Sequence, residues 1–199
     1  MFTALLTAIT VLWKSFLAFI RCFQRITISD PENRLVVITG CDSGFGLMTT
    51  QKLLKQKYFV VPLCLTEKGV KELDEFCKSN GFTRCLPLLC DVTKEEDVKK
   101  AYDRVEELMK EKKGLKMWAL INNAGIAPGG FLDWLSMDAF RRTMEVNYFA
   151  IVLMTKTFLE LMKRSKYSRI INISSMAGHT GFPHGCPYSG TAPSPSLSD

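Results

Sequence analysis

The chain has 199 residues, a formal net charge of +6 and a hydrophobic fraction of 47%. These values suit one domain with a short appendage and exclude wholesale disorder. Thirteen glycines and eight prolines exclude collagen-like and low-complexity classes. Basic residues are scattered among acidic ones, as in residues 95–100 (EEDVKK), instead of gathering in a patch, so we expect no nucleic-acid partner.

Residues 2–20 form an apolar run whose only charged side chain is Lys14. The run is near the lower length limit of a spanning helix, about 20 residues, and it lacks the charged start and small-residue cleavage site of a signal peptide. We therefore predict an uncleaved membrane anchor over residues 1–27, spanning the bilayer or lying in its interface. Because Arg21 and Arg25 follow the run, the positive-inside rule puts the remaining chain in the cytosol. The alternative is an amphipathic helix packed on the protein itself.

After a polar linker at residues 30–33, short apolar runs alternate with amphipathic segments. We expect strands over residues 35–39, 58–65, 85–90, 118–121 and 169–173. We expect helices over residues 44–56, 69–79, 93–113 and 137–165. Thr93 and Glu96 have the spacing of a capping box for the third helix. This alternation predicts an α/β fold with a doubly wound parallel sheet.

The seven cysteines are odd in number and contain no C-x-x-C pair. Several lie within apolar runs, as Cys64 does, which favours buried free thiols in a reducing compartment over a disulfide framework. Their spacing does not match a zinc site, so we expect no metal.

A glycine-rich motif occupies residues 39–46 (TGCDSGFG), between the first predicted strand and the first predicted helix. Gly40 permits a tight turn, Gly44 lets the backbone approach a pyrophosphate, and Gly46 allows close packing of the helix. The helix N-terminus would then offer free N–H groups to phosphates. The motif favours a dinucleotide site over a purely structural turn.

The pattern T-G-x-x-x-G-x-G resembles the fingerprint of the short-chain dehydrogenase/reductase family. Three further motifs resemble that family in order: N-N-A-G at residues 122–125, E-V-N at residues 145–147, and Ser175 followed thirteen residues later by Tyr188. The resemblance implies a Rossmann domain over residues 28–191.

Two strings indicate the branch of the family. Residues 40–46 and 64–69 are most similar to the membrane-anchored retinol and hydroxysteroid dehydrogenases, a branch that also includes a mitochondrial 3-hydroxybutyrate dehydrogenase. The branch implies a hydrophobic alcohol or ketone as substrate, and the endoplasmic reticulum as the compartment.

The resemblance also implies roles for individual residues. In the family's catalytic positions, Ser175 would hydrogen-bond the substrate oxygen, Tyr188 would exchange its proton, and Asn147 would position a water. For Asn147 a structural role inside the helix is an equal alternative. The implied cofactor-binding residues are Gly40, Ser43, Gly44, Phe45, Gly46, Asp91, Val92, Asn122, Ala124 and Gly125. Asp91 and Val92 would hold the adenine, and residues 122–125 would line the adenosine ribose, with a structural loop as their alternative.

Cofactor choice depends on the end of the second strand. An acidic residue there accepts the ribose hydroxyls of NAD, and a basic one accommodates the 2′-phosphate of NADP. Residues 66–68 (TEK) offer both, and we favour NAD over NADP. For His179 and His184 we favour exposed positions over lining the substrate pocket. A Ser-His hydrolase is rejected because the sequence lacks G-x-S-x-G.

The family pattern breaks after Tyr188. The family reads Tyr-x-x-x-Lys, but Ala192 stands at the lysine position and a Pro/Ser-rich tail, residues 192–199, follows. We expect a C-terminally truncated isoform or a frameshifted gene, with a sheet incomplete on its C-terminal side. The missing ammonium would otherwise stabilise the phenolate, so we expect feeble alcohol oxidation at neutral pH.

Truncation would also expose apolar surface. We expect residues 169–173 to form an unprotected edge strand, and Phe140, Phe149 and Leu153 to be exposed or to form a homodimer contact. Three readings follow: a membrane-anchored NAD(P)-dependent dehydrogenase, a non-catalytic isoform that binds cofactor or a partner chain, and a fragment without a stable fold.

Overall fold

The computed structural model describes Trp13, residues 30–178, Thr180 and residues 184–191. The chain divides into two units, residues 1–30 and 31–199. Apart from Trp13, the predicted anchor lies outside the described residues, and so do His179 and the tail at 192–199. No helix in the described part of the chain is both long and apolar enough to cross a membrane.

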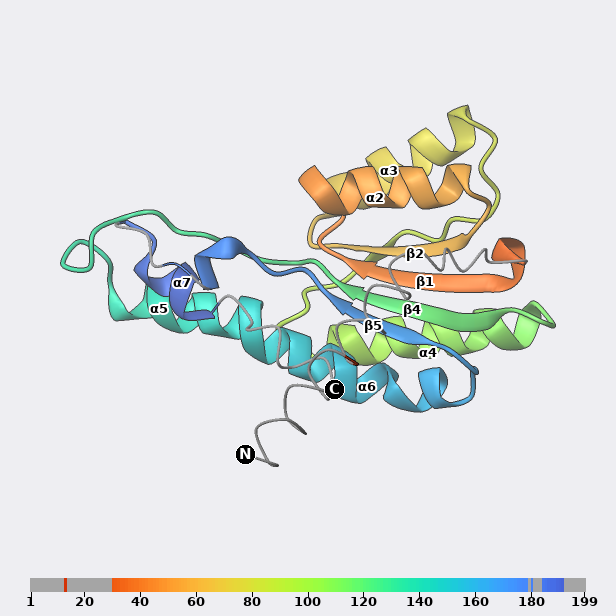
Figure 1. Ribbon diagram of the computed structural model, residues 1–199. Coiled ribbons are helices and arrows are strands. Elements are labelled where there is room, and N and C mark those ends of the chain that lie inside the picture. The colour runs from red at the N-terminus through yellow and green to blue at the C-terminus, as the bar shows by residue number, and fades with distance from the viewer. Residues whose placement is uncertain (1–12, 14–29, 179, 181–183, 192–199) are drawn as a thin grey trace, which may run out of the picture. The chain divides into compact units, whose positions relative to one another are not determined.

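Five parallel strands form one sheet in the order β3-β2-β1-β4-β5 (Figure 1). Their bounds are β1 Arg34–Thr39, β2 Phe59–Cys64, β3 Leu88–Leu89, β4 Lys116–Asn122 and β5 Arg169–Asn172. Nearly every residue of β1, β2 and β4 is buried, which explains why these strands read as continuous apolar runs instead of alternating ones. The doubly wound α/β prediction is confirmed.

Helices cover both faces of this sheet (Figure 1). Helices α2 (Gly44–Lys55) and α3 (Glu67–Ser79) lie on one face, and α4 (Glu95–Glu111) and α6 (Ala150–Lys163) lie on the other. The chain moves outward from β1 to β3 and then returns to β4 on the opposite side of β1. In such a fold the crevice for a ligand opens where the strand order reverses, at the carboxyl ends of β1 and β4.

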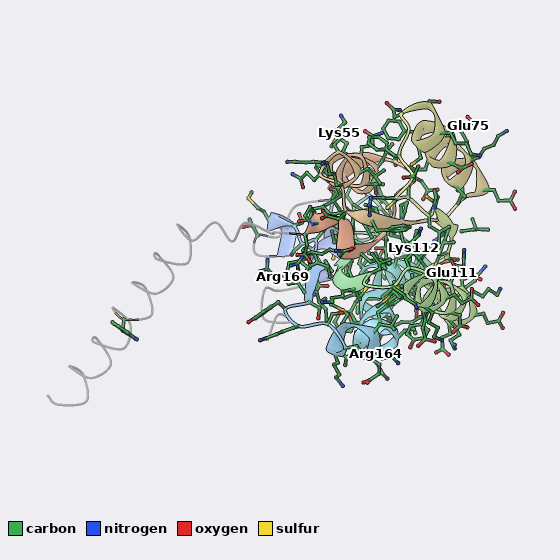
Figure 2. All side chains as sticks on the ribbon, turned by 90° about the vertical axis from the view of Figure 1, so that its right-hand side faces the viewer. Lys55, Glu75, Glu111, Lys112, Arg164 and Arg169 are labelled. Atoms are coloured by element: carbon green, nitrogen blue, oxygen red, sulfur yellow. The ribbon has the colours of Figure 1, made fainter. Side chains whose placement is uncertain are left out.

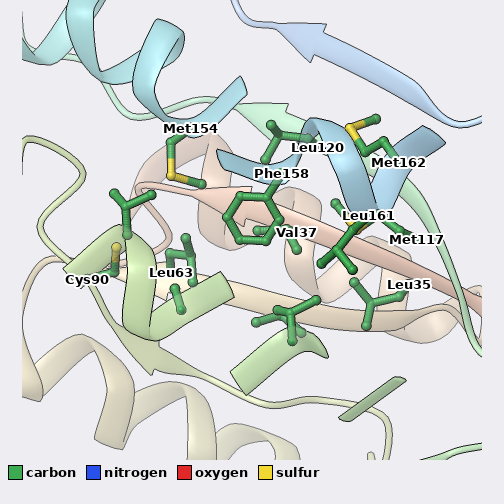
Figure 3. Close-up of a cluster of buried hydrophobic side chains, with 14 of the residues drawn as sticks. Leu35, Val37, Leu63, Cys90, Met117, Leu120, Met154, Phe158, Leu161 and Met162 are labelled. Atoms are coloured by element: carbon green, nitrogen blue, oxygen red, sulfur yellow. The ribbon is translucent and has the colours of Figure 1, made fainter. Parts of the chain in front are cut away.

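The main core lies between the sheet and the α4/α6 layer (Figure 3). The ring of Phe158 is fully buried there, among Val37 of β1, Leu120 of β4 and Leu161 of α6. Burial of one such side chain stabilises the fold by about 1.5–3 kcal/mol. Charged side chains such as Lys55, Glu75, Glu111 and Arg164 instead project from the helices (Figure 2).

Three details of the secondary structure differ from the sequence expectation. The capping box is wrong: α4 begins at Glu95, and the Thr93 hydroxyl donates to Asp91 Oδ1 at 2.7 Å instead of capping the helix. The third strand is short because Pro87, which has no N–H to donate, interrupts residues 85–90; only Leu88–Leu89 pair with β2 as a strand. The long helix is divided into α5 (Met137–Met144), a π-helical turn η2 (Glu145–Phe149) and α6.

Strand β5 forms an edge of the described sheet. Ile170, Ile171 and Ile173, along and just beyond it, are 38%, 41% and 46% exposed, in line with the expected apolar edge. On the preceding helix, Phe149 is 49% exposed, whereas Phe140 and Leu153 are half-buried and Leu153 packs against the core. Of the three aromatic and aliphatic side chains expected to be exposed, only Phe149 is.

Candidate cofactor and substrate site

The glycine-rich turn lies between the carboxyl end of β1 and helix α2. Gly40 and Gly44 have φ angles of +69° and +58°, a region that side chains with a Cβ rarely adopt. A Cβ on Gly46 would lie 2.1 Å from the Gly40 carbonyl oxygen, so only glycine lets α2 start this close to the turn. A Cβ on Gly44 would meet nothing within 4 Å, because this residue faces open space.

Strand β4 holds the turn from the other side. The Thr39 hydroxyl accepts hydrogen bonds from the backbone N–H groups of Asn123 and Ala124, both at 2.9 Å. The Asn123 amide donates to the Thr39 carbonyl at 2.8 Å and to the Gly40 carbonyl at 3.2 Å. Thr39 and Asn123 therefore fix the turn against β4, a role that the sequence motifs alone did not assign to them.

A pocket of about 790 Å³ opens beneath this turn. Its walls come from four segments that follow β1, β2, β3 and β4, and from the η2 turn with the end of α5. The predicted cofactor residues that line it are Gly40, Ser43, Gly44, Phe45, Asp91, Val92, Ala124 and Gly125. The structure thus brings together residues separated by up to 85 positions in the sequence, in a cavity of the size that ligands of this class require.

Two predicted cofactor residues do not line the pocket. Gly46 packs behind the turn, as described above. Asn122 is 3% exposed and points to the opposite side, where its amide donates to Asn172 Oδ1 at 2.8 Å and to the Thr155 hydroxyl at 3.4 Å. Its position favours a structural role, joining β4 to β5 and α6.

Asp91, which follows β3, lines the larger pocket. Burial opposes its ionisation, but hydrogen bonds from the hydroxyl and N–H of Thr93, with the charges of Lys94 and Arg142, hold the pKa of this carboxyl below its ordinary value. Arg142 also lines the pocket. Arg142 is a site residue that the sequence analysis missed, because no motif marks it.

A smaller pocket of about 270 Å³ adjoins the first one. The two share Phe45, Gly125 and three other residues of the segment that follows β4. Ser175, which follows β5, and Tyr188, on the short helix α7 (Cys186–Thr191), both line the smaller pocket. The predicted serine and tyrosine therefore face the same cavity, next to the end of the larger pocket.

Asn147 lies in the π-helical turn between α5 and α6 and is 5% exposed. Its Oδ1 accepts from the Ile126 N–H at 2.9 Å, and its Nδ2 donates to the Ile126 carbonyl at 2.9 Å and to the Thr191 hydroxyl at 3.0 Å. These bonds fix the loop after β4 and the helix of Tyr188. These contacts lie outside the helix that carries Asn147, and its side chain also borders the smaller pocket.

The remaining candidates lie away from both pockets. Glu67 faces a separate hollow between α3 and β3, and Lys68 pairs with Glu72 at 3.6 Å on the exposed face of α3. His184 is exposed and contacts Phe131 edge to face, with ring centroids 4.0 Å apart. Ala192 lies outside the described residues.

The larger pocket fits the diphosphate of a dinucleotide. Gly44 leaves open space at the N-terminus of a twelve-residue helix, and the N-cap residue Ser43 makes no side-chain capping bond that would occupy its first N–H groups. Free N–H groups and the helix dipole together favour a phosphate at this position.

Comparison with known proteins agrees with this geometry. A family model for short chain dehydrogenases matches residues 34–192. The chain belongs to the short-chain dehydrogenase family. In that family, the dehydrogenase/reductase SDR family member 9 of Bos taurus is 37% identical, over 80% of this chain and 48% of that protein. The mitochondrial D-beta-hydroxybutyrate dehydrogenase of Mus musculus is 39% identical, over 79% of this chain and 45% of that protein.

Retinol dehydrogenase 16 of Mus musculus is 34% identical, over 87% of this chain and 51% of that protein. These relatives confirm the predicted branch of the short-chain dehydrogenases. The chain spans about half the length of the relatives it matches.

Solved structures of short-chain dehydrogenases share the fold. A Burkholderia phymatum member in complex with NAD superposes with a TM-score of 0.74 at 23% identity, over 82% of this chain and 57% of that one. A gluconate 5-dehydrogenase of Burkholderia cenocepacia in complex with NADP and tartrate gives 0.69 at 26% identity, over 80% and 60%. Both nicotinamide dinucleotides thus occur among proteins of this fold.

Proposed function

We propose that the chain is built as a nicotinamide-dependent oxidoreductase for a hydrophobic alcohol, retinol-like or steroid-like, and its carbonyl. The observation that carries the proposal is the arrangement of two adjoining pockets. One lies under the glycine-rich turn, and the other is lined by both Ser175 and Tyr188. NAD is our preferred cofactor, and the relatives named retinol, hydroxysteroid and hydroxybutyrate dehydrogenases support the alcohol class.

In this proposal each residue has a defined task. The first turn of α2 would hold the diphosphate of the dinucleotide, and the chemistry that the nicotinamide would supply is acceptance of a hydride from the alcohol carbon. Tyr188 takes the hydroxyl proton, and Ser175 donates a hydrogen bond to the substrate oxygen. Asn147 positions the loop after β4 and the helix that carries Tyr188.

The alternative is a catalytically impaired chain that only binds cofactor or a partner. Ala192 favours it, because it stands four residues after Tyr188, where the family motif has a lysine. Without the ammonium of that lysine, proton transfer at neutral pH loses part of the roughly 10²–10⁴-fold that positioned acid–base catalysis supplies. The membrane anchor at residues 1–27, the cytosolic side of the endoplasmic reticulum and a homodimer remain part of the proposal.

The test is a turnover assay on the full chain in detergent micelles. NAD or NADP would be supplied with all-trans-retinol, a hydroxysteroid or 3-hydroxybutyrate, and the carbonyl product quantified by chromatography. We expect slow turnover that Tyr188→Phe abolishes and Ala192→Lys raises. Turnover that Tyr188→Phe leaves unchanged would refute the catalytic assignment. Measurable turnover that is equal in the original chain and in Ala192→Lys would refute the impaired alternative.

A further inference from the structure

The segment that follows β2 supplies no acid to the larger pocket from its own side chains. Leu65, directly after β2, lines the pocket and is 58% exposed. Glu67 faces the separate hollow beside β3, and Lys68 is engaged with Glu72 on the outer face of α3. The acid and the base that the sequence offers for ribose recognition are therefore both absent from the pocket lining.

A carboxylate nevertheless reaches this position from the glycine-rich turn. Asp42 Oδ2 accepts a hydrogen bond from the Leu65 N–H at 2.8 Å. Asp42 Oδ1 accepts from the Thr66 N–H at 2.9 Å and from the Thr66 hydroxyl at 2.6 Å. Asp42 itself lines the larger pocket. Its carboxylate therefore occupies the end of β2, although it belongs to the segment after β1.

Local sequence accommodates this carboxylate specifically. A Cβ on Gly69 would lie 2.5 Å from Asp42 Oδ1, so a glycine in the first turn of α3 lets the carboxylate approach. The Thr66 hydroxyl, which donates to Asp42, also accepts from the Gly69 N–H at 3.0 Å and caps α3. These contacts fix the side chain of Asp42 before any ligand binds.

These hydrogen bonds leave the Asp42 carboxylate able to accept one more. A carboxylate has about four acceptor positions, two on each oxygen. Three are used, two on Oδ1 and one on Oδ2. The remaining position on Oδ2 can accept from a hydroxyl group, whereas a phosphate at the same place would bring a second anion against it without a proton to donate.

Other charges at the pocket do not reverse this preference. Among its described lining residues, Arg142 is the only lysine or arginine, and its charge lowers the pKa of Asp91, which follows β3 beside the end of β2. The acidic lining residues are Asp42, Asp91 and Glu145, so the formal charge of the lining is negative.

We propose that Asp42 selects NAD over NADP in this chain by accepting a hydrogen bond from the 2′-hydroxyl of the adenosine ribose. This inference rests on the proposed function, since it presupposes a nicotinamide dinucleotide in the larger pocket. The specificity-determining residue thus lies in the glycine-rich turn and not among residues 66–68.

The experiment measures dissociation constants of NADH and NADPH for the full chain in detergent micelles, from the fluorescence of the reduced nicotinamide. We expect NADH to bind at least tenfold more tightly than NADPH. Asp42→Asn removes the charge and should reduce this ratio by about 10- to 100-fold, which corresponds to the loss of one hydrogen bond to a charged group. Glu72→Gln removes the same charge from the outer face of α3 and should leave the ratio unchanged.

Because Asp42 also joins the glycine-rich turn to α3, a second variant keeps Asp42 intact. Leu65→Arg adds a cation at the pocket lining next to the carboxylate and should tighten NADPH binding at least tenfold, while changing NADH binding less. The role of Asp42 is overturned if the original chain binds both cofactors equally, or if neither Asp42→Asn nor Leu65→Arg changes the ratio. Either result leaves the proposed function standing. A chain with normal helical circular dichroism that binds neither cofactor would overturn the proposed function as well. A ratio that changes with Arg142→Gln and not with the Asp42 variant would assign the selection to Arg142.

Discussion

Gly46 and Gly44 are two residues apart, yet the structure predicts opposite consequences for their replacement by alanine. At Gly46 the new Cβ would lie 2.1 Å from the Gly40 carbonyl oxygen and 2.7 Å from Asn123 Nδ2. The first obstacle is backbone, so α2 itself would have to move. We take the upper part of the range for overpacking, about 3 kcal/mol, and subtract about 1 kcal/mol for the better helix propensity of alanine. The free energy of unfolding should therefore fall by about 2 kcal/mol.

At Gly44 the new Cβ would meet no atom within 4 Å, but φ is +58°. The left-handed conformation costs an alanine about 1–2 kcal/mol, partly offset by about 0.4–1 kcal/mol from the reduced entropy of the unfolded chain. Gly81 provides the matched control: its φ is +69°, its Cβ would also meet nothing within 4 Å, and it does not line the larger pocket. Gly44→Ala and Gly81→Ala should therefore destabilise the chain equally, by about 1 kcal/mol.

The three variants would be compared by thermal unfolding followed by circular dichroism, and by NADH titration. About 1 kcal/mol corresponds to about 2–4 °C for a chain of this size, so Gly46→Ala should lower the Tm by about 4–8 °C and the other two by half as much. Gly44→Ala and Gly81→Ala should be equally stable. Of these two, only Gly44→Ala should weaken NADH binding, because its methyl group enters the phosphate position. The reasoning is refuted if Gly46→Ala unfolds no earlier than Gly81→Ala, or if Gly44→Ala binds NADH as well as Gly81→Ala does.

Three further predictions concern side chains. Burial raises the pKa of three thiols to about 12, so few of them are thiolates at pH 8. Iodoacetamide at that pH should modify the exposed Cys186 and leave the three buried thiols intact. Peptide mass mapping that finds the buried thiols modified in the folded protein would contradict this. The three buried thiols are those of Cys41, Cys64 and Cys90. Because folding lowers the pKa of Asp91, its carboxylate stabilises the fold at pH values above its unfolded-state pKa, near 3.8. This contribution is lost as the pH falls through the lower folded-state pKa. In urea denaturation, the original chain and Asp91→Asn should therefore differ less in free energy of unfolding at pH 3 than at pH 6. An equal difference at the two pH values would disprove the assignment. Asn147→Ala removes the bonds to Ile126 and Thr191, so we expect a loss of about 2 kcal/mol in urea denaturation, and unchanged stability would show that these bonds are dispensable.

The sequence by itself determined the order of strands and helices and the position of the phosphate-binding turn. Both depend on local rules: buried parallel strands need apolar runs on both faces, and a turn between β1 and α2 needs glycines at fixed offsets. That Ser175 and Tyr188 would share a site was predicted instead by resemblance to the family motif. The local rules failed at Thr93, whose hydroxyl donates to Asp91 Oδ1 instead of accepting a hydrogen bond from a backbone N–H of α4.

Tertiary structure alone decided what the polar side chains near the site contact. Asn122 and Asn123 are neighbours in sequence, but the alternation of a strand sends Asn122 to the α6 side and leaves Asn123 to hold the glycine-rich turn. Asp42 meets residues 23 and 24 positions away because parallel strands end at the same edge of the sheet. The acidic residue that sequence reasoning sought at the end of β2 is therefore provided by a different segment, which only the folded arrangement of β1 beside β2 brings to that place.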